Sequence, residues 1–108
     1  MSNYIFREFY IPERMMGSLR RYIDEKIRPG NFLSAVIRND LRDACGLADD
    51  ENLTNLPAYV AYFYNEAPSI CWGSQAKMVA WLTVGEEERN EKANKEDDEN
   101  GRREKERL

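Results

Sequence analysis

Histidine is absent from this 108-residue chain, so the side chain that most often serves as a general base or a metal ligand cannot contribute here. The chain has two cysteines, Cys45 and Cys71, and they do not form the C-x-x-C pairs that structural zinc sites use. A glycine-rich loop that could cradle phosphate groups is also missing. These absences predict a protein that is not an enzyme and that carries no metal or cofactor.

Long apolar runs are absent too. No stretch reaches the length of apolar chain that crosses a bilayer, so we expect no membrane partner. The N-terminal residues MSNYIFREFY become charged early and lack the apolar segment of a secretory signal. We therefore expect a cytoplasmic protein whose cysteines stay reduced.

The C-terminal segment 86–108 has almost no apolar side chains, because Ala93 and the terminal Leu108 are the only ones. It contains ten acidic and seven basic residues. Such a segment cannot bury enough apolar surface to offset the entropy that folding removes. We expect residues 1–85 to form one compact helical domain. We expect residues 86–108 to be a charged, largely disordered tail, unless they extend the last helix.

The formal net charge of −4 comes mostly from this tail, which leaves residues 1–85 close to neutral. Nucleic-acid-binding domains are usually basic, so we do not expect a nucleic-acid partner. A domain of this size has a thin core, and self-association would add buried apolar surface. The sequence therefore favours a homo-oligomer.

Apolar residues recur at helical spacing in four segments. The first predicted helix covers residues 12–26, with Pro12 in its first turn. The second covers residues 31–46, with Asn31 as its N-terminal cap and Gly46 as its C-terminal cap. In the middle of this second helix, Asn39 suggests a buried hydrogen bond to a turn at residues 62–65, as a structural clasp or as the floor of a pocket.

The third predicted helix covers residues 49–67, and an aspartate at its start can cap it. Pro57 lies inside the pattern and should kink or restart the helix. Its predicted buried stripe is Leu53, Leu56, Val60, Phe63 and Ala67. Ser74 is placed to cap a fourth helix.

Residues 3–10 show a partial alternation of apolar and polar side chains, which is typical of an extended segment. One strand cannot make a sheet alone, so this arm would pair with its copy in another subunit or lie across the helices. The sequence therefore predicts an all-α fold, a small bundle of about four helices with a short extended N-terminal arm.

The segment YVAYFYNEAPSICWGS at 59–74 combines aromatic side chains with a tight connection, which indicates either a core corner or the wall of a binding site. Aromatic faces can stack on a nucleotide, while arginines and the N–H groups at a helix N-terminus can bind its phosphates. The alternative is that these aromatics are core and that the arginines form ion pairs. The candidate ligand-binding residues are Arg14, Arg20, Arg21, Arg38, Asn39, Tyr62, Tyr64, Asn65, Trp72, Gly73 and Ser74.

Several linked phrases cover most of residues 1–85 and none of the tail. They are IPERMM at 11–16, PGNFLSAV at 29–36, NDL at 39–41, YFYNEAP at 62–68 and CWGS at 71–74. In these phrases the chain resembles a group of short proteins of tailed phages and prophages, a group with no established activity. The resemblance implies a small accessory protein made in a bacterial cytoplasm, and it brings no catalytic or binding role with it.

Three functional hypotheses follow. The first is a phage accessory protein for counter-defence that sequesters a small anionic or nucleotide ligand between the subunits of an oligomer. The alternative is an inhibitor that docks on a host or defence enzyme, with the acidic tail as a nucleic-acid mimic or as a guide for association. The third is a DNA-associated regulator, which the near-neutral body and the acidic tail disfavour.

Overall fold

The computed structural model describes residues 4–106, and it describes side chains over residues 4–94. The elements in chain order are β1 (Tyr4–Phe6), β2 (Phe9–Ile11), α1 (Glu13–Glu25), α2 (Asn31–Ile37), α3 (Leu41–Leu47), α4 (Asp50–Thr54), α5 (Leu56–Glu66), the 3-10 helix η1 (Ser69–Cys71) and α6 (Gln75–Glu106). The fold is mostly helical, as predicted, but it contains a small two-stranded sheet and six α-helices within the described residues.

The N-terminal arm is a hairpin, which corrects the prediction of a single extended strand. β1 and β2 pair in antiparallel register, with Ile5 opposite Tyr10. Arg7 adopts a left-handed conformation with φ 57° in the turn between them. The hairpin packs on α5 through an edge-to-face contact between Tyr4 and Tyr62, whose ring centroids lie 5.2 Å apart.

The second predicted helix is two helices, because the chain breaks at Asn39 between α2 and α3. Asn39 has φ 63°, and it is exposed, so it makes no buried clasp. Asp40 then caps α3 by accepting a hydrogen bond from the N–H of Asp43 at 3.1 Å. Asparagine and aspartate favour turns and caps over helix interiors, which explains the break. Gly46 lies inside α3 and does not cap it, and Gly30 takes the cap position expected for Asn31.

The third predicted helix is also divided, and here the restart at Pro57 is confirmed. Asp49 caps α4 by accepting from the N–H of Asn52 at 2.8 Å. Pro57 lies in the first turn of α5, where its missing N–H costs no helical hydrogen bond. These two breaks account for the larger number of helices.

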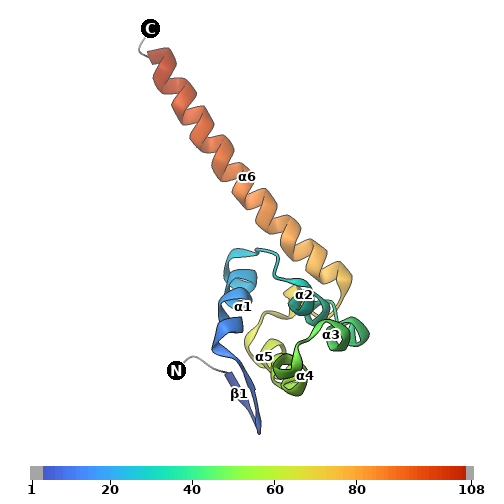
Figure 1. Ribbon diagram of the computed structural model, residues 1–108. Coiled ribbons are helices and arrows are strands. Elements are labelled where there is room, and N and C mark those ends of the chain that lie inside the picture. The colour runs from blue at the N-terminus through green and yellow to red at the C-terminus, as the bar shows by residue number, and fades with distance from the viewer. Residues whose placement is uncertain (1–3, 107–108) are drawn as a thin grey trace.

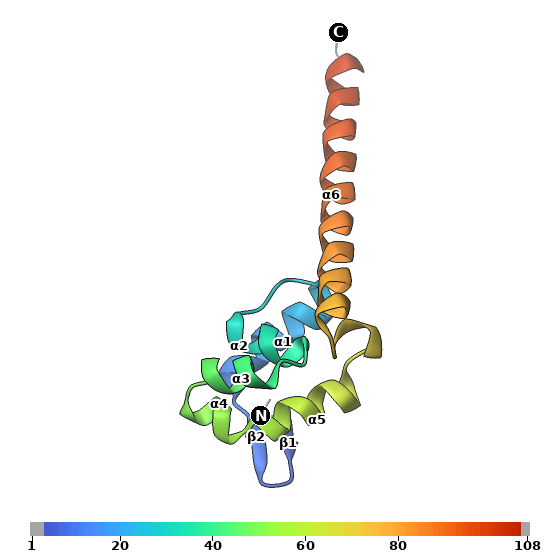
Figure 2. The same cartoon turned by 90° about the vertical axis from the view of Figure 1, so that its right-hand side faces the viewer.

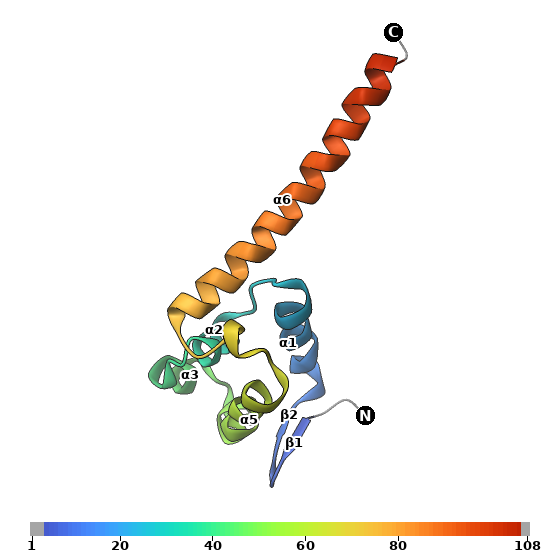
Figure 3. The same ribbon diagram turned by 180° about the vertical axis from the view of Figure 1, so that it is seen from behind.

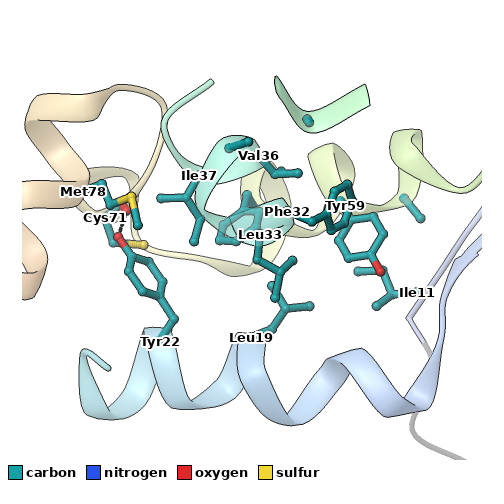
Figure 4. Packing of buried hydrophobic residues seen from close by; sticks show 14 of the residues in the cluster. Ile11, Leu19, Tyr22, Phe32, Leu33, Val36, Ile37, Tyr59, Cys71 and Met78 are labelled. Atoms are coloured by element: carbon teal, nitrogen blue, oxygen red, sulfur yellow. Dashed lines mark hydrogen bonds between the residues drawn. The ribbon is translucent and has the colours of Figure 1, made fainter. Parts of the chain in front are cut away.

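The core lies between α1 and the layer formed by α2 and α5. Figure 4 shows Leu19 and Tyr22 reaching from α1 toward Leu33 of α2 and toward Cys71. Leu19, Tyr22 and Tyr59 are fully buried. The Tyr22 hydroxyl donates to the Cys71 carbonyl oxygen at 2.6 Å, so the buried phenol has its hydrogen-bond partner.

Helix α6 leaves the body at the end opposite the hairpin, which makes the molecule 66 Å long (Figures 1 and 3). Its first turns cap the C-terminus of α1. The Trp81 indole N–H donates to the Tyr22 carbonyl oxygen at 2.8 Å, and Arg89 donates to the Glu25 carbonyl oxygen at 3.1 Å. The Tyr22 carbonyl oxygen also accepts from the Lys26 N–H at 3.1 Å, whereas Glu25 is the last residue of α1 and its carbonyl group has no partner within the helix. The two bonds from α6 stabilise the junction.

The charged segment 86–106 continues α6 up to Glu106, which was the second of the two expectations for the tail. Beyond the junction with α1, this helix has no apolar face to bury. Its sequence places Glu88 four residues before Lys92 and Glu91 four residues before Lys95, a spacing at which opposite charges support a solvated helix. The division of the chain into a body and a tail stays a prediction.

At Gly85, α6 passes close to Lys26 at the end of α1. A Cβ atom at this position would lie 2.5 Å from the Cβ atom of Lys26 and 2.7 Å from its carbonyl oxygen. Neither of these atoms can move without the backbone of α1. At Gly46, inside α3, a Cβ atom would have nothing within 4 Å.

We expect Gly85→Ala to lower the free energy of unfolding by about 1–3 kcal/mol, because overpacking at the junction outweighs the gain in helix propensity. Gly46→Ala is the matched control and should leave stability unchanged or raise it by up to about 1 kcal/mol. Urea unfolding followed by tryptophan fluorescence measures both variants. Equal stabilities for the two variants would show that α6 does not pack on α1 as described.

Candidate functional site

A candidate concave surface lies along the outer side of α5. Two open hollows of about 470 and 550 Å3 meet there, and Val60 and Tyr64 line both. We call the two together the α5 groove. The hollow on the hairpin side is completed by Phe6, Pro57, Ala61 and Asn65. The hollow on the α6 side is completed by Asn39, Ala67, Ser69, Trp72, Gly73 and Lys77.

Helix α5 can line the groove because two of its faces are apolar. Tyr59 and Phe63 are fully buried in the core, whereas the next residue along in each case points outward. Val60 is 50% exposed and Tyr64 is 77% exposed. The prediction that Val60 belongs to the buried stripe is therefore wrong. Because one face of α5 is fixed in the core, the outer face is held rigidly.

Basic side chains lie at the two ends of the groove. Lys77 lines the hollow on the α6 side, and its Nζ donates to the Ser69 carbonyl oxygen at 3.2 Å. At the other end, the Arg7 guanidinium carbon lies 5.1 Å from the centroid of the Phe6 ring. Figure 2 shows the hairpin beside α5, with η1 and the start of α6 following its C-terminal end.

No carboxylate is among the residues that line either hollow, within the part of the chain whose side chains are described. A third hollow of only about 40 Å3 adjoins the groove at Val60 and Asn39, and it does include Asp40. That carboxylate accepts from the N–H of Asp43 and lies 3.5 Å from Arg38, and both interactions lower its pKa. The groove thus presents apolar surface between two cationic ends.

The connection from η1 to α6 forms one wall of the groove. Gly73 has φ 105°, a conformation that favours glycine, and its N–H donates to the Ile37 carbonyl oxygen at 2.7 Å. The Ser74 hydroxyl accepts from the N–H of Lys77 at 3.1 Å, which confirms the predicted cap. Ser74 and Lys77 have the Ser-x-x-Lys spacing of some acylating serine enzymes. Here the Lys77 amine bonds to the Ser69 carbonyl group instead of the serine hydroxyl.

The structure brings about half of the predicted ligand-binding residues together. Asn39, Tyr64, Asn65, Trp72 and Gly73 all line the α5 groove, and Ser74 follows directly. They come from α5, from the η1 connection and from the break between α2 and α3.

Tyr62 lies on the core side of α5. Its ring packs edge-on against Tyr4 and Phe63, with the Phe63 centroid at 5.9 Å, and burial raises the pKa of its hydroxyl.

The predicted arginines do not line the groove. Arg14 pairs with Asp49 and Glu51, each at 3.0 Å. Arg38 pairs with Asp43 at 2.8 Å.

The remaining two arginines belong to α1. Arg20 is exposed, and its charge lowers the pKa of Tyr62 although burial dominates that shift. Arg21 donates to the hydroxyl of its neighbour Ser18 at 3.1 Å. The alternative interpretation, that the arginines form ion pairs, describes Arg14 and Arg38, whereas none of the ion pairs described for residues 4–94 includes Arg20 or Arg21.

Sequence reasoning missed the basic side chains at the ends of the groove and its apolar floor. Lys77 could have been found from its position three residues after the predicted cap Ser74. Arg7 and Phe6 could not, because their place beside α5 depends on the hairpin. Val60 is predicted to lie in the core because apolar residues recur at helical spacing on both faces of α5, and the spacing does not tell which face is buried.

Cys71 lies behind the groove wall and is fully buried. Burial raises the pKa of its thiol to about 11, so the thiol is protonated at neutral pH and is a poor nucleophile.

Comparisons with protein-family models, with curated proteins and with solved structures each found no match. None of the helices in the described part of the chain is long and apolar enough to span a membrane. Among the same residues, no group of three or more His, Cys, Asp or Glu side chains could hold a metal ion.

The contacts of Arg14 predict an acid-sensitive connection between the hairpin, α1 and α4. Tyr10 donates to Glu51 at 2.7 Å, and this bond and the Arg14 contact lower the pKa of Glu51. The cap bond from Asn52 is the main cause of the lowered pKa of Asp49, and Arg14 adds to it. A carboxylate whose pKa is lowered by folding stabilises the native state above its ordinary pKa, and this stabilisation is lost as the pH falls through the folded value.

We therefore expect the unfolding midpoint in urea to be constant near neutral pH and to fall below about pH 4. Arg14→Ala should reduce this acid-dependent loss, because it removes a charge that favours the ionised carboxylates. Arg42→Ala, at an exposed arginine of α3, is the control and should keep the wild-type profile. An Arg14→Ala profile parallel to the wild type would contradict the assigned role.

Proposed function

We propose that this chain is a small, non-enzymatic accessory protein that acts by docking on another protein, and that the α5 groove is its docking surface. The observation that carries this proposal is the exposure of Val60 and Tyr64 at the centre of a long apolar groove. Contiguous apolar surface of this kind is typical of protein-interaction sites.

The composition of the groove supports the proposal. Tyrosine and tryptophan are among the residues most often found at the energetic centre of protein interfaces, and here Tyr64 and Trp72 line the same hollow. The Trp72 ring is held from behind by Phe63, at a centroid distance of 5.8 Å. Because the Trp72 ring is already positioned, it loses little conformational entropy when a partner binds.

The resemblance to small phage and prophage proteins suggests the setting. We propose that the chain acts in the cytoplasm of a bacterial host, where it would inhibit a host or defence enzyme in a counter-defence role. The excess of acids over bases in segment 86–108 would guide association with a basic partner surface. A homo-oligomer, a nucleic-acid-mimicking role for the tail and a DNA-associated regulator remain untested predictions, and the last is still disfavoured by charge.

Capture of a small anionic or nucleotide ligand is the second candidate. The hollow on the α6 side supports it, since its volume of about 470 Å3 suits a small molecule, and it combines Tyr64, Trp72 and Lys77. Against it, Lys77 is the only basic side chain among the described residues, 4–94, that line this hollow. A nucleotide site would be expected to use several phosphate contacts, so docking is the better supported function.

Val60 and Val79 give a matched test of docking, because both are 50% exposed and only Val60 lines the groove. A photo-crosslinking phenylalanine derivative placed at position 64 and expressed in the bacterial host should give discrete protein adducts, identified by mass spectrometry. Val60→Glu should abolish these adducts, because a carboxylate on the apolar floor would be desolvated by a partner. Val79→Glu, on α6, should leave them unchanged.

Two results would contradict docking. Adducts that survive Val60→Glu would place the interaction elsewhere on the chain. Native mass spectrometry that finds the purified protein with extra mass of nucleotide size, lost in Trp72→Ala, would favour the second candidate instead.

A further inference from the structure

The two basic side chains at the ends of the α5 groove indicate which charges the docked segment should carry. We infer that the partner presents a short apolar stretch flanked on both sides by carboxylates. This inference rests on the proposed docking function and adds the chemical class of the occupant.

Lys77 provides the charge at the α6 end of the groove. Its amine is exposed and makes one hydrogen bond to a neutral carbonyl group, so its charge is not neutralised by a carboxylate in any described ion pair. It also belongs to the first turn of α6, where the helix dipole adds a partial positive charge. Both effects favour an acidic group on a docked segment.

Arg7 provides the charge at the hairpin end. Its guanidinium stacks on Phe6, which itself lines the groove, so the charge sits beside apolar surface that a partner would cover. The left-handed backbone of Arg7 turns the chain tightly at this point, which holds the side chain near Phe6. No ion pair described for residues 4–94 includes Arg7.

The lack of carboxylates between these ends is informative because the whole chain has 20 acidic and 16 basic residues. Glu66, the acid closest in sequence to Tyr64 and Asn65, does not line either hollow. Asp40, on the neighbouring small hollow, is held by Arg38 and by the cap of α3.

Glu8 follows Arg7 in the hairpin turn, and it lines a different hollow together with Asp50 and Glu51. Within the α5 groove, an incoming carboxylate would therefore meet the charges of Lys77 and Arg7 and no carboxylate among the described lining residues.

The length of the groove limits the apolar stretch. The groove lining follows α5 from Pro57 to Ala67, ten residues that correspond to about 15 Å along the helix axis. About three turns of a partner helix, or four to five residues of extended chain, cover that distance. The acidic residues of the partner should therefore begin just outside an apolar core of this size.

Charge pairs at an exposed rim add modest affinity and mainly set specificity and the rate of association. Two such pairs together correspond to about a tenfold change in the dissociation constant. The effect should weaken with added salt, because both ends are open to solvent.

The test uses the full chain and three synthetic peptides with the same apolar core, flanked by glutamate, glutamine or lysine. Binding is measured by fluorescence anisotropy of labelled peptide. We expect the glutamate-flanked peptide to bind about tenfold more tightly than the glutamine-flanked one, and the lysine-flanked peptide to bind most weakly. The double variant Arg7→Glu/Lys77→Glu should reverse this order.

Arg28→Glu/Lys92→Glu is the matched control, since it makes the same change in net charge at two exposed cations outside the groove. It should keep the wild-type order. Equal binding of the three peptides, or the same loss in both double variants, would overturn the inference.

The failure of this inference can be told apart from the failure of docking. If the photo-crosslinks at position 64 depend on Val60 but the affinity for the peptides does not depend on their flanking charge, the docking proposal is retained and the inference of an acidic partner is wrong. If no peptide binds and no crosslink depends on Val60, both proposals are wrong. In either case, circular dichroism of the variants verifies that the fold is retained.

Discussion

Tyr22 is the residue on which the arrangement of the molecule depends. Its hydroxyl donates to the Cys71 carbonyl oxygen of η1, and its own carbonyl oxygen accepts from Trp81 of α6. The side chain of Tyr22 therefore fixes the segment that forms a wall of the α5 groove, and its main-chain carbonyl group holds the helix that leaves the body. The phenol is fully buried, and burial raises its pKa well above the ordinary value, so it remains a hydrogen-bond donor at any physiological pH.

The groove exists because α5 has more apolar surface than the core uses. Tyr59 and Phe63 fill the core, and the Tyr59 ring meets Phe32 edge-on at 5.1 Å, so the helix cannot rotate to bury Val60 and Tyr64 instead. Exposed apolar residues are common on protein surfaces, and Ile5, Leu41 and Ile70 are each more exposed than Val60. The docking proposal therefore rests on the position of Val60 and Tyr64 in one groove, and not on their exposure alone.

Much of the local structure could be predicted from local signals, and the long-range contacts could not. The first helix, the caps Asp49 and Ser74 and the restart at Pro57 follow from residues close in sequence. The break at Asn39 depends partly on Gly73, whose N–H donates a hydrogen bond to the Ile37 carbonyl oxygen at the end of α2. For the same reason, sequence reasoning found the aromatic wall of the groove but placed its positive charge on arginines that lie elsewhere. Arg14, for example, forms ion pairs with Asp49 and Glu51, and partners so far along the chain are not visible in a pattern of residue types.

The acidic run of the tail lies far from the basic ends of the groove in the same molecule, so it does not neutralise their charge. Lys77 lies at the beginning of α6, and the acidic run at 96–99 lies about 30 Å further along the same helix. The helix carries that run away from the body, on the side opposite the hairpin that bears Arg7 (Figure 1). At the ionic strength of a cell, charges separated by that distance are largely screened from each other. Under the docking proposal, the carboxylates that complement Lys77 and Arg7 would come from another chain, and the tail would be free to interact with a different part of the same partner.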